Sequence, residues 1–316
     1  MEKFNVNTAF NKKYKTPEHI QEKKSRMVDE LLANNKVRQV ISELNVTMEE
    51  IYNNLGLFIR LLEAYEDCAK CNKEKCTFAR EGMIPYLVRD EFDELNIKYT
   101  LCDIAREKRL VNLNYLYKDY DSLFEDINFA TLDPTSVCTN KEAAISNARI
   151  SKEIFNIARS EVNKDSNFIL FGKRGSGKTG YTVALTNYLV RENHKCAHVD
   201  LRKLMNLLIA KISMKENDSY NSTLAILNDV EVLVIDNLGD EKITDWSRNL
   251  LSDILSNRNR SDKMTIITTS HSYDDLLSLY SAIKGDSNYR ANKIKSEDLI
   301  NQIKTLAKRE FVLRND

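Results

Sequence analysis

The chain has 316 residues, of which 42% are hydrophobic and 30% charged, and its 47 Lys and Arg balance its 47 Asp and Glu, so the formal net charge is zero. This composition excludes a disordered chain and a disulfide-stapled miniprotein, and it lacks the basic excess that drives unaided nucleic-acid binding. At roughly 150 residues per domain, the length predicts two domains.

The apolar runs are only a few residues long, which predicts no transmembrane helix, and residues 1–15 (MEKFNVNTAFNKKYK) lack the apolar core of a signal peptide. We therefore expect a cytoplasmic protein. In that compartment cysteines bind metals or stay free more often than they form disulfides.

Helices are predicted over residues 18–66, where apolar positions recur every three or four residues. Thr47 followed by Glu50 has the spacing of a capping box and predicts the start of the second of these helices. We expect the apolar stripes to form core or a partner-docking face.

Four cysteines follow in a stretch, residues 67–110, where the helical period fades and segments 86–88 and 96–101 alternate like strands. Clustered thiols in a small unit of a cytoplasmic protein favour a structural, tetrahedral Zn²⁺ site, with free thiols and redox chemistry as alternatives. The predicted zinc ligands are Cys68, Cys71, Cys76 and Cys102. Cys138 and Cys196 stand alone and are expected to be small buried side chains.

The chain from 115 to 140 has little regularity and carries Asp133-Pro134, which disfavours a helix there. We interpret it as a linker that leads into the second domain. The predicted organisation is therefore a helical, zinc-stapled domain at 1–115, a linker at 116–140 and a larger domain at 141–316.

The larger domain is predicted to be α/β. A helix candidate at 141–163 precedes four apolar runs, and helical patterns lie between them. Buried parallel strands joined by crossover helices produce this alternation, so we expect a parallel sheet flanked by helices. The expected strands are 167–172, 196–201, 231–236 and 264–270, and the helices between them are 178–192, 201–215 and 245–259.

One segment matches G-x-x-x-x-G-K-[ST] in full, between an apolar strand and a predicted helix. Such a loop curls so that backbone N–H groups point at phosphates, while the lysine reaches the β- and γ-phosphates and the final hydroxyl binds Mg²⁺. The alternative is a glycine-rich turn that binds nothing. The predicted nucleotide-binding residues are Gly172, Lys173, Arg174, Gly175, Ser176, Gly177, Lys178, Thr179 and Gly180.

Asp236 ends the apolar run EVLVI and is the predicted second Mg²⁺ ligand, since ligands of parallel sheets bind at the carboxyl ends of strands. His271 follows the strand at 264–270 and is a candidate for a phosphate or water contact. An ordinary turn or core residue is the alternative for His271.

These motifs together resemble the bacterial primosomal helicase loaders of the DnaI/DnaC type, which are AAA+ ATPases. The resemblance rests on the cysteine-rich module, LFEDI, GKRGSGKT, VLVIDNLGDE and Trp246-Ser247-Arg248. It implies an AAA+ core that binds ATP and Mg²⁺ and self-associates. It also implies an N-terminal domain that grips the replicative hexameric helicase, so that the helicase is delivered onto single-stranded DNA during replication initiation or restart.

The sequence departs from the pattern of these loaders at three places. At one of them, His271 follows Thr-Ser where these loaders tend to carry Asn. Asn237 stands where they usually carry a second acid, so hydrolysis should be weak unless Asp240 or Glu241 substitutes. Where they supply an arginine finger, this chain has Gln302 and Lys304. Arg290 and Arg248 are the remaining candidates for that role.

A cluster of basic residues follows Asp236 and is a candidate DNA-backbone contact, with a solvated charged face as the alternative. Its members are Arg248, Arg258, Arg260 and Lys263. Two rival functions remain open. One is an IstB-type transposition-helper ATPase, which the cysteine module disfavours, and the other is a nucleotide-binding scaffold with little hydrolysis.

Overall fold

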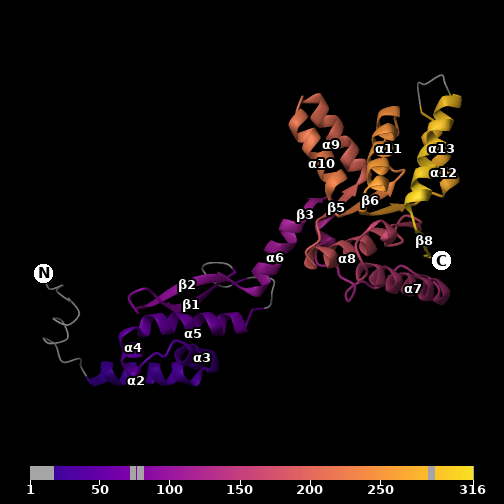
Figure 1. Ribbon diagram of the computed structural model, residues 1–316. Coiled ribbons are helices and arrows are strands. Elements are labelled where there is room, and N and C mark those ends of the chain that lie inside the picture. Colours follow the sequence, from indigo (N-terminus) through magenta and orange to yellow (C-terminus); the bar gives the residue numbers. More distant parts are fainter. Residues whose placement is uncertain (1–17, 72–75, 77–81, 284–288, 316) are drawn as a thin grey trace. The chain divides into compact units, whose positions relative to one another are not determined.

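The chain divides into two compact units in the computed structural model, Met1–Lys108 and Arg109–Asp316 (Figure 1). The segment 1–15, on which the signal-peptide expectation rests, lies outside the described residues. Within the described part, no helix is long and apolar enough to cross a membrane. The structure describes residues 18–71, 76, 82–283 and 289–315.

The N-terminal unit combines helices with a two-stranded antiparallel hairpin. The predicted helical region and the two predicted strand segments are confirmed. Apolar side chains of the helices and the hairpin, among them Phe58 and Leu87, share one core. The elements are α2 (Glu18–Ala33), α3 (Asn35–Glu43), α4 (Met48–Asn53), α5 (Leu55–Ala69), β1 (Met83–Arg89) and β2 (Leu95–Leu101).

The predicted capping box is present at the start of α4. The Thr47 hydroxyl accepts a hydrogen bond from the Glu50 backbone N–H, and the Glu50 carboxylate accepts one from the Thr47 N–H at 2.8 Å. The same carboxylate pairs with Arg89 at 2.8 Å, which ties α4 to β1. Hydrogen bonds from Arg89 and Thr47 lower the pKa of Glu50 to about 2.

The second unit is built on a six-stranded sheet in the order β3-β5-β6-β7-β4-β8, and all its strand pairs are parallel. The predicted α/β fold with a parallel sheet is confirmed. Apolar side chains that alternate along the buried strands form a separate core on each face of the sheet. The strands are β3 (Tyr115–Lys118), β4 (Phe168–Gly172), β5 (Cys196–Asp200), β6 (Val232–Leu238), β7 (Met264–Thr269) and β8 (Arg309–Leu313).

Helices cover both faces of this sheet (Figure 1). Two of them, α7 and α8, pack on one face, and the helices from α9 to α13 pack on the other. The helices are α7 (Lys141–Ala158), α8 (Lys178–Arg191), α9 (Leu201–Ser213), α10 (Asn217–Asp229), α11 (Asp245–Arg260), α12 (Tyr273–Ser281) and α13 (Tyr289–Leu306). A further helix, α6 (Asp103–Asn114), precedes β3, and short 3₁₀ turns are η1 (Ser122–Phe124) and η2 (Lys164–Ser166).

The segment interpreted as a linker is instead attached to the second unit along its length. Its first residues form the edge strand β3, which pairs with β5. Farther along, the Asn187 amide of α8 donates to the carbonyls of Glu125 and Ile127. The sequence hides this attachment because a four-residue strand is too short to show a period.

Two of the four basic residues assigned to a DNA-binding cluster are buried, and that assignment is wrong for them. Arg248 is 1% exposed and Arg258 is 0% exposed. Arg248 donates to the carbonyls of Tyr280 and Asn292, and Arg258 donates to those of Leu227 and Val230. These arginines donate hydrogen bonds to carbonyl groups inside the fold. Burial also excludes Arg248 as an arginine finger.

Candidate nucleotide-binding site

The glycine-rich loop joins the buried strand β4 to α8, as the motif predicts. Gly175 and Gly177 have φ of +81° and +87°, in the left-handed region that side chains rarely adopt. A side chain at Gly172 would collide with the Ser176 hydroxyl across the turn. The tight curl of this loop therefore requires glycine at these positions.

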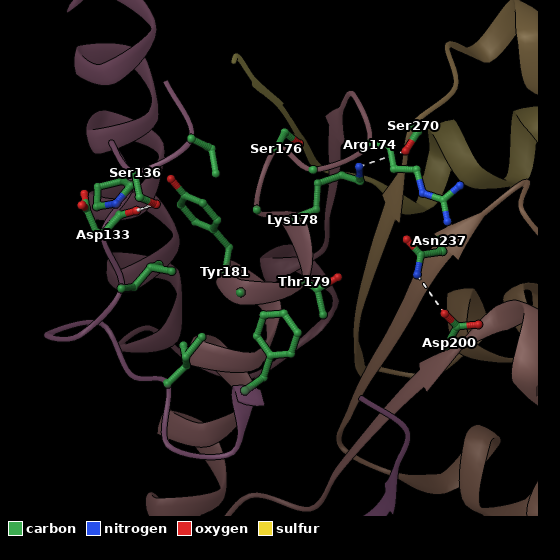
Figure 2. A pocket seen from close by; sticks show the side chains of 18 of the residues that line it. Asp133, Ser136, Arg174, Ser176, Lys178, Thr179, Tyr181, Asp200, Asn237 and Ser270 are labelled. Carbon is green, nitrogen blue, oxygen red and sulfur yellow. Dashed lines mark hydrogen bonds between the residues drawn. The ribbon is translucent and has the colours of Figure 1, made fainter. Parts of the chain in front are cut away.

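Lys178 begins α8 and is 5% exposed. Its ammonium donates to the carbonyls of Gly172 and Lys173 at 2.7 and 3.1 Å, and to the Ser270 hydroxyl at 3.0 Å (Figure 2). Burial lowers the pKa of Lys178, and the carboxylates of Asp236 and Asp240 oppose that effect. The positive charge is thus held inside the loop, where a phosphate would meet it.

The two predicted Mg²⁺ ligands lie together. The Thr179 hydroxyl donates to the Asp236 carboxylate at 2.8 Å, and the Thr268 hydroxyl bonds the other oxygen of that carboxylate. Hydroxyl and carboxylate oxygens are the ligands that Mg²⁺ prefers. The loop fits a phosphate as well, since the buried Ser176 hydroxyl has no hydrogen-bond partner within the described residues. The residues present therefore fit a magnesium nucleotide.

A cavity of about 550 Å³ opens beside the loop, a volume typical of small-molecule sites. Its walls come from the loop and α8, from the ends of β5 and β6, and from the segment between η1 and α7. That last wall carries the half-buried apolar side chains Phe124, Ile127, Leu132 and Pro134. Sequence reasoning missed this wall, because its apolar residues follow no period.

Asn237 also lines the cavity, and its amide donates to the Asp200 carboxylate at 2.9 Å (Figure 2). Asp200 was not predicted as a site residue. Its signal is the one that identified Asp236, since it ends the apolar strand CAHVD, and in the sheet it pairs in register with Asp236. Arg202, just beyond it, is an exposed basic residue at the cavity wall that was also missed.

The two acids expected to substitute for the missing one differ in position. Asp240 is exposed and lines the cavity, 3.4 Å from the His271 ring. Glu241 is 6% exposed, its carboxylate bonds the Tyr280 hydroxyl and the Gly239 N–H, and burial raises its pKa. Glu241 is engaged in the core and does not line the cavity.

His271 contacts Asp240, whereas the preceding residue, Ser270, contacts Lys178. His271 lines a second cavity of about 460 Å³, together with Lys173 and Tyr273. Just after β7, it is therefore Ser270, and not His271, that bonds the lysine of the loop.

The residues at the expected arginine-finger position make contacts within the chain. The Gln302 side chain accepts a hydrogen bond from Ser252 at 3.0 Å. The Lys304 ammonium lies 4.8 Å from the centre of the Tyr273 ring. Arg290 is exposed on α13 and remains a candidate for that role.

The four clustered cysteines are half-buried. The Gly82 N–H donates to the Cys76 sulfur and the Ala105 N–H to the Cys102 sulfur, both at 3.3 Å. Burial raises the pKa of Cys68, and the other three thiols add to that effect. Nevertheless, no group of three or more His, Cys, Asp or Glu side chains among residues 18–71, 76, 82–283 and 289–315 is placed to hold a metal ion.

The two solitary cysteines differ from each other. Cys196 is buried in β5, as expected. Cys138 is only half-buried and accepts a hydrogen bond from the Asn147 amide at 3.2 Å, so the expectation of a buried side chain is wrong there.

Comparisons with known proteins agree with a nucleotide-binding site at this loop. Residues 104–287 match the sequence profile described as IstB-like ATP binding protein. The replicative helicase loader DnaI of Bacillus subtilis (strain 168) is 22% identical over 267 residues, covering 81% of this chain and 81% of the relative. The replicative helicase loader DnaC of Buchnera aphidicola subsp. Acyrthosiphon pisum (strain APS) is 27% identical over 100 residues, covering 32% of this chain and 41% of the relative.

A solved structure titled "Crystal Structure of the DnaI" has the same fold over 62% of this chain and 95% of that chain, with a TM-score of 0.50 and 20% identity. The resemblance to the DnaI/DnaC-type loaders, inferred from the motifs, is confirmed.

Proposed function

The chain belongs to the IstB-like ATP-binding protein family, and on that premise we propose that it is a cytoplasmic, ATP-dependent loader of a replicative hexameric DNA helicase. It would deliver that helicase onto single-stranded DNA in replication initiation or restart. One observation carries the choice within the family. The similarity to DnaI extends over 267 residues, more than the second unit contains, so it includes part of the N-terminal unit.

The nucleotide acts as a switch in this proposal. The loop and Lys178 bind the phosphates, and Thr179 and Asp236 would hold Mg²⁺, which neutralises phosphate charge when bound. ATP-dependent order at the loop favours self-association of the AAA+ domain and helicase binding, and hydrolysis releases the loader. We expect weak turnover, because the Asn237 amide cannot accept a proton, unless another acid takes the role of the one missing at this position.

Single-stranded DNA would contact a local patch of basic residues, and this patch alone would bind DNA only weakly. Of the basic cluster, Arg260 is exposed at the end of α11. Lys263 is half-buried and donates to the Asn228 carbonyl at 3.1 Å. Arg260 is therefore the first residue to change in a test of DNA binding.

The N-terminal unit would hold one structural Zn²⁺ through Cys68, Cys71, Cys76 and Cys102. Two of these sulfurs accept backbone N–H bonds, which stabilise thiolates, and the other three thiols act electrostatically on Cys68. We expect about one zinc per chain, lost in Cys71→Ser and kept in the control Cys138→Ser. Elemental analysis that finds no zinc in the wild-type protein would remove the metal from the proposal.

A scaffold with little hydrolysis is the second candidate, favoured by Asn237 and Gln302. Phosphate release that disappears in Lys178→Ala rejects it. Tight ATP binding without turnover favours it. The IstB-type transposition-helper function is favoured by the matched family profile, which spans residues 104–287 and omits most of the N-terminal unit.

The loader proposal is tested by light scattering after size-exclusion chromatography. The protein is mixed with the replicative hexameric helicase of its own host, with and without ATP and Mg²⁺, and residues 1–115 are run in parallel. We expect a complex that the N-terminal piece also forms. No complex with the full chain under any condition would reject the loader function and leave the transposition helper or the scaffold.

A further inference from the structure

We propose that Asp200 is the general base for ATP hydrolysis in this chain and that Asn237 positions it. The inference rests on the proposed ATPase function and concerns the acid that replaces the one missing at position 237. It starts from a pair of side chains, Asp200 and Asn237, that face each other across the ends of β5 and β6 (Figure 2).

The Asp200 carboxylate has the placement that a base requires. It ends β5 beside Asp236 in the neighbouring strand, and it shares the wall of the nucleotide cavity with Lys178 and Thr179. Asp200 is 9% exposed, so most bulk water is excluded from it while the cavity side stays open. A water molecule on a bound γ-phosphate would lie in this cavity.

Two hydrogen bonds fix the carboxylate. One oxygen accepts from the Asn237 amide at 2.9 Å, and the other accepts from the Lys203 N–H at 3.0 Å, where Asp200 caps α9. Each carboxylate oxygen has two acceptor positions, so each keeps one for water. The group is thus oriented by the protein and still able to take a proton.

The other acids near the loop are committed elsewhere. Asp236 is bonded by the hydroxyls of Thr179 and Thr268. Glu241 is buried against Tyr280, away from the cavity. Asp240 is exposed and paired with His271, so it lacks the second fixing bond and the exclusion from solvent that Asp200 has.

Asn237 then has a defined task. Its φ is +62°, and its backbone N–H donates to the Thr268 hydroxyl at 3.1 Å, which holds the residue at the turn. From there its amide reaches the neighbouring strand. The amide takes no proton itself, but it orients a carboxylate one strand away, so Asn237 is a positioning residue.

A water proton passes to the Asp200 carboxylate while the water oxygen forms a bond to the γ-phosphorus. The bond between that phosphorus and the β–γ bridging oxygen breaks, ADP leaves with the electron pair, and the proton on Asp200 returns to solvent. General-base catalysis of this kind typically contributes about 10²- to 10⁴-fold.

The test is Asp200→Asn, which removes the base but keeps an oxygen able to cap α9. We expect kcat for phosphate release to fall at least about 100-fold, while KM and the affinity for a fluorescent ATP analogue change less than about threefold. The matched control is Asp253→Asn, an exposed acid on α11, which should keep wild-type turnover. Asp240→Asn is measured beside it.

The swapped variant Asp200→Asn/Asn237→Asp separates catalysis from structure. It returns a carboxylate to the pair from the other strand, and we expect at least tenfold more turnover than in Asp200→Asn alone. A swap no more active than the single variant contradicts the assigned pairing. Wild-type turnover in Asp200→Asn, or a larger loss in Asp240→Asn, overturns the inference while the ATPase proposal stands. ATP binding without phosphate release in the wild-type protein instead rejects the ATPase proposal itself.

Discussion

Arg258 bonds to carbonyl groups between strands and helices. Its guanidinium donates to the carbonyls of Leu227, Val230 and Met264 and to the Thr265 hydroxyl, and burial lowers its pKa to about 10. The group therefore stays charged at neutral pH. Its charge serves the fold, because its removal would take a charged hydrogen-bond donor from several buried acceptors at once.

We predict that Arg258→Met destabilises the second unit by about 3 kcal/mol or more, because several buried acceptors lose their donor together. Arg260→Met, two residues away and exposed, should cost less than about 0.5 kcal/mol. Chemical denaturation followed by Trp246 fluorescence measures both. Equal stability of the two variants would contradict the structural role of Arg258.

We predict that Lys178→Ala weakens binding of a fluorescent ATP analogue by about 100-fold, because it removes a charge-assisted hydrogen-bond donor to phosphate. The fold should persist, as judged by circular dichroism. Lys203→Ala is the control, since its ammonium pairs with Asp119 and does not line the cavity. Unchanged affinity in Lys178→Ala would refute the site.

At the scale of single residues, the sequence predicts those residues whose role is defined by a local motif. The loop glycines, Lys178 and Asp236 were found because spacing and flanking strands define them. Asp200 was missed because its partner, Asn237, comes from another strand. Arg248 and Arg258 were misplaced because a charged residue on a helix gives no sign of which carbonyls surround it.

Helix α4 illustrates how one element is held by both local and distant bonds. Its capping-box acid, Glu50, is also the partner of Arg89 in β1. Because the bonds from Arg89 and Thr47 together lower the pKa of Glu50 from 4.5 to about 2, their contribution to stability is complete above pH 4.5 and is lost as the pH falls towards 2.

We predict that Glu50→Gln destabilises the N-terminal unit at pH 6 and that the difference from wild type shrinks at pH 3, where Glu50 in the unfolded chain is already protonated. Denaturant unfolding at the two pH values measures it. Glu49→Gln removes a charge from the same turn and leaves the Arg89 pair intact. A difference that stays constant with pH would show that the charge of Glu50 does not contribute to stability.

A second prediction at the scale of the elements concerns the edge strand β3. A fragment that begins at residue 141 lacks β3, which exposes the edge of β5, and lacks the apolar cavity wall at 124–137. We expect it to aggregate or to bind an ATP analogue at least about tenfold more weakly than a fragment of residues 103–316. If the two fragments were equally soluble and bound the analogue equally well, the segment would be a linker, as the sequence predicts.

The sequence predicts the four buried strands and, between them, α8, α9 and α11, because long apolar runs and helical periods are visible locally. The elements it did not predict are α6, α10, α12, α13, β3 and β8. The edge strands β3 and β8 are half-exposed and short, so their residues give weak period-two patterns.

At the scale of the molecule, the two units have separate apolar cores. We therefore predict two unfolding transitions in calorimetry. ATP with Mg²⁺ should raise the transition temperature of the second unit only. The single tryptophan, Trp246, lies in that unit, so its fluorescence identifies the transition. A single transition that moves as a whole with nucleotide would contradict independent units.

The arrangement of β4 between β7 and β8 has a consequence for synthesis. The phosphate loop follows β4 directly, yet both neighbours of that strand are encoded much later, and Gly172 pairs with Leu313. On the ribosome the loop emerges long before the strands that immobilise it. A nascent chain should therefore acquire affinity for nucleotide only after residues 309–313 have left the exit tunnel, which couples ATP binding to the completion of the sheet.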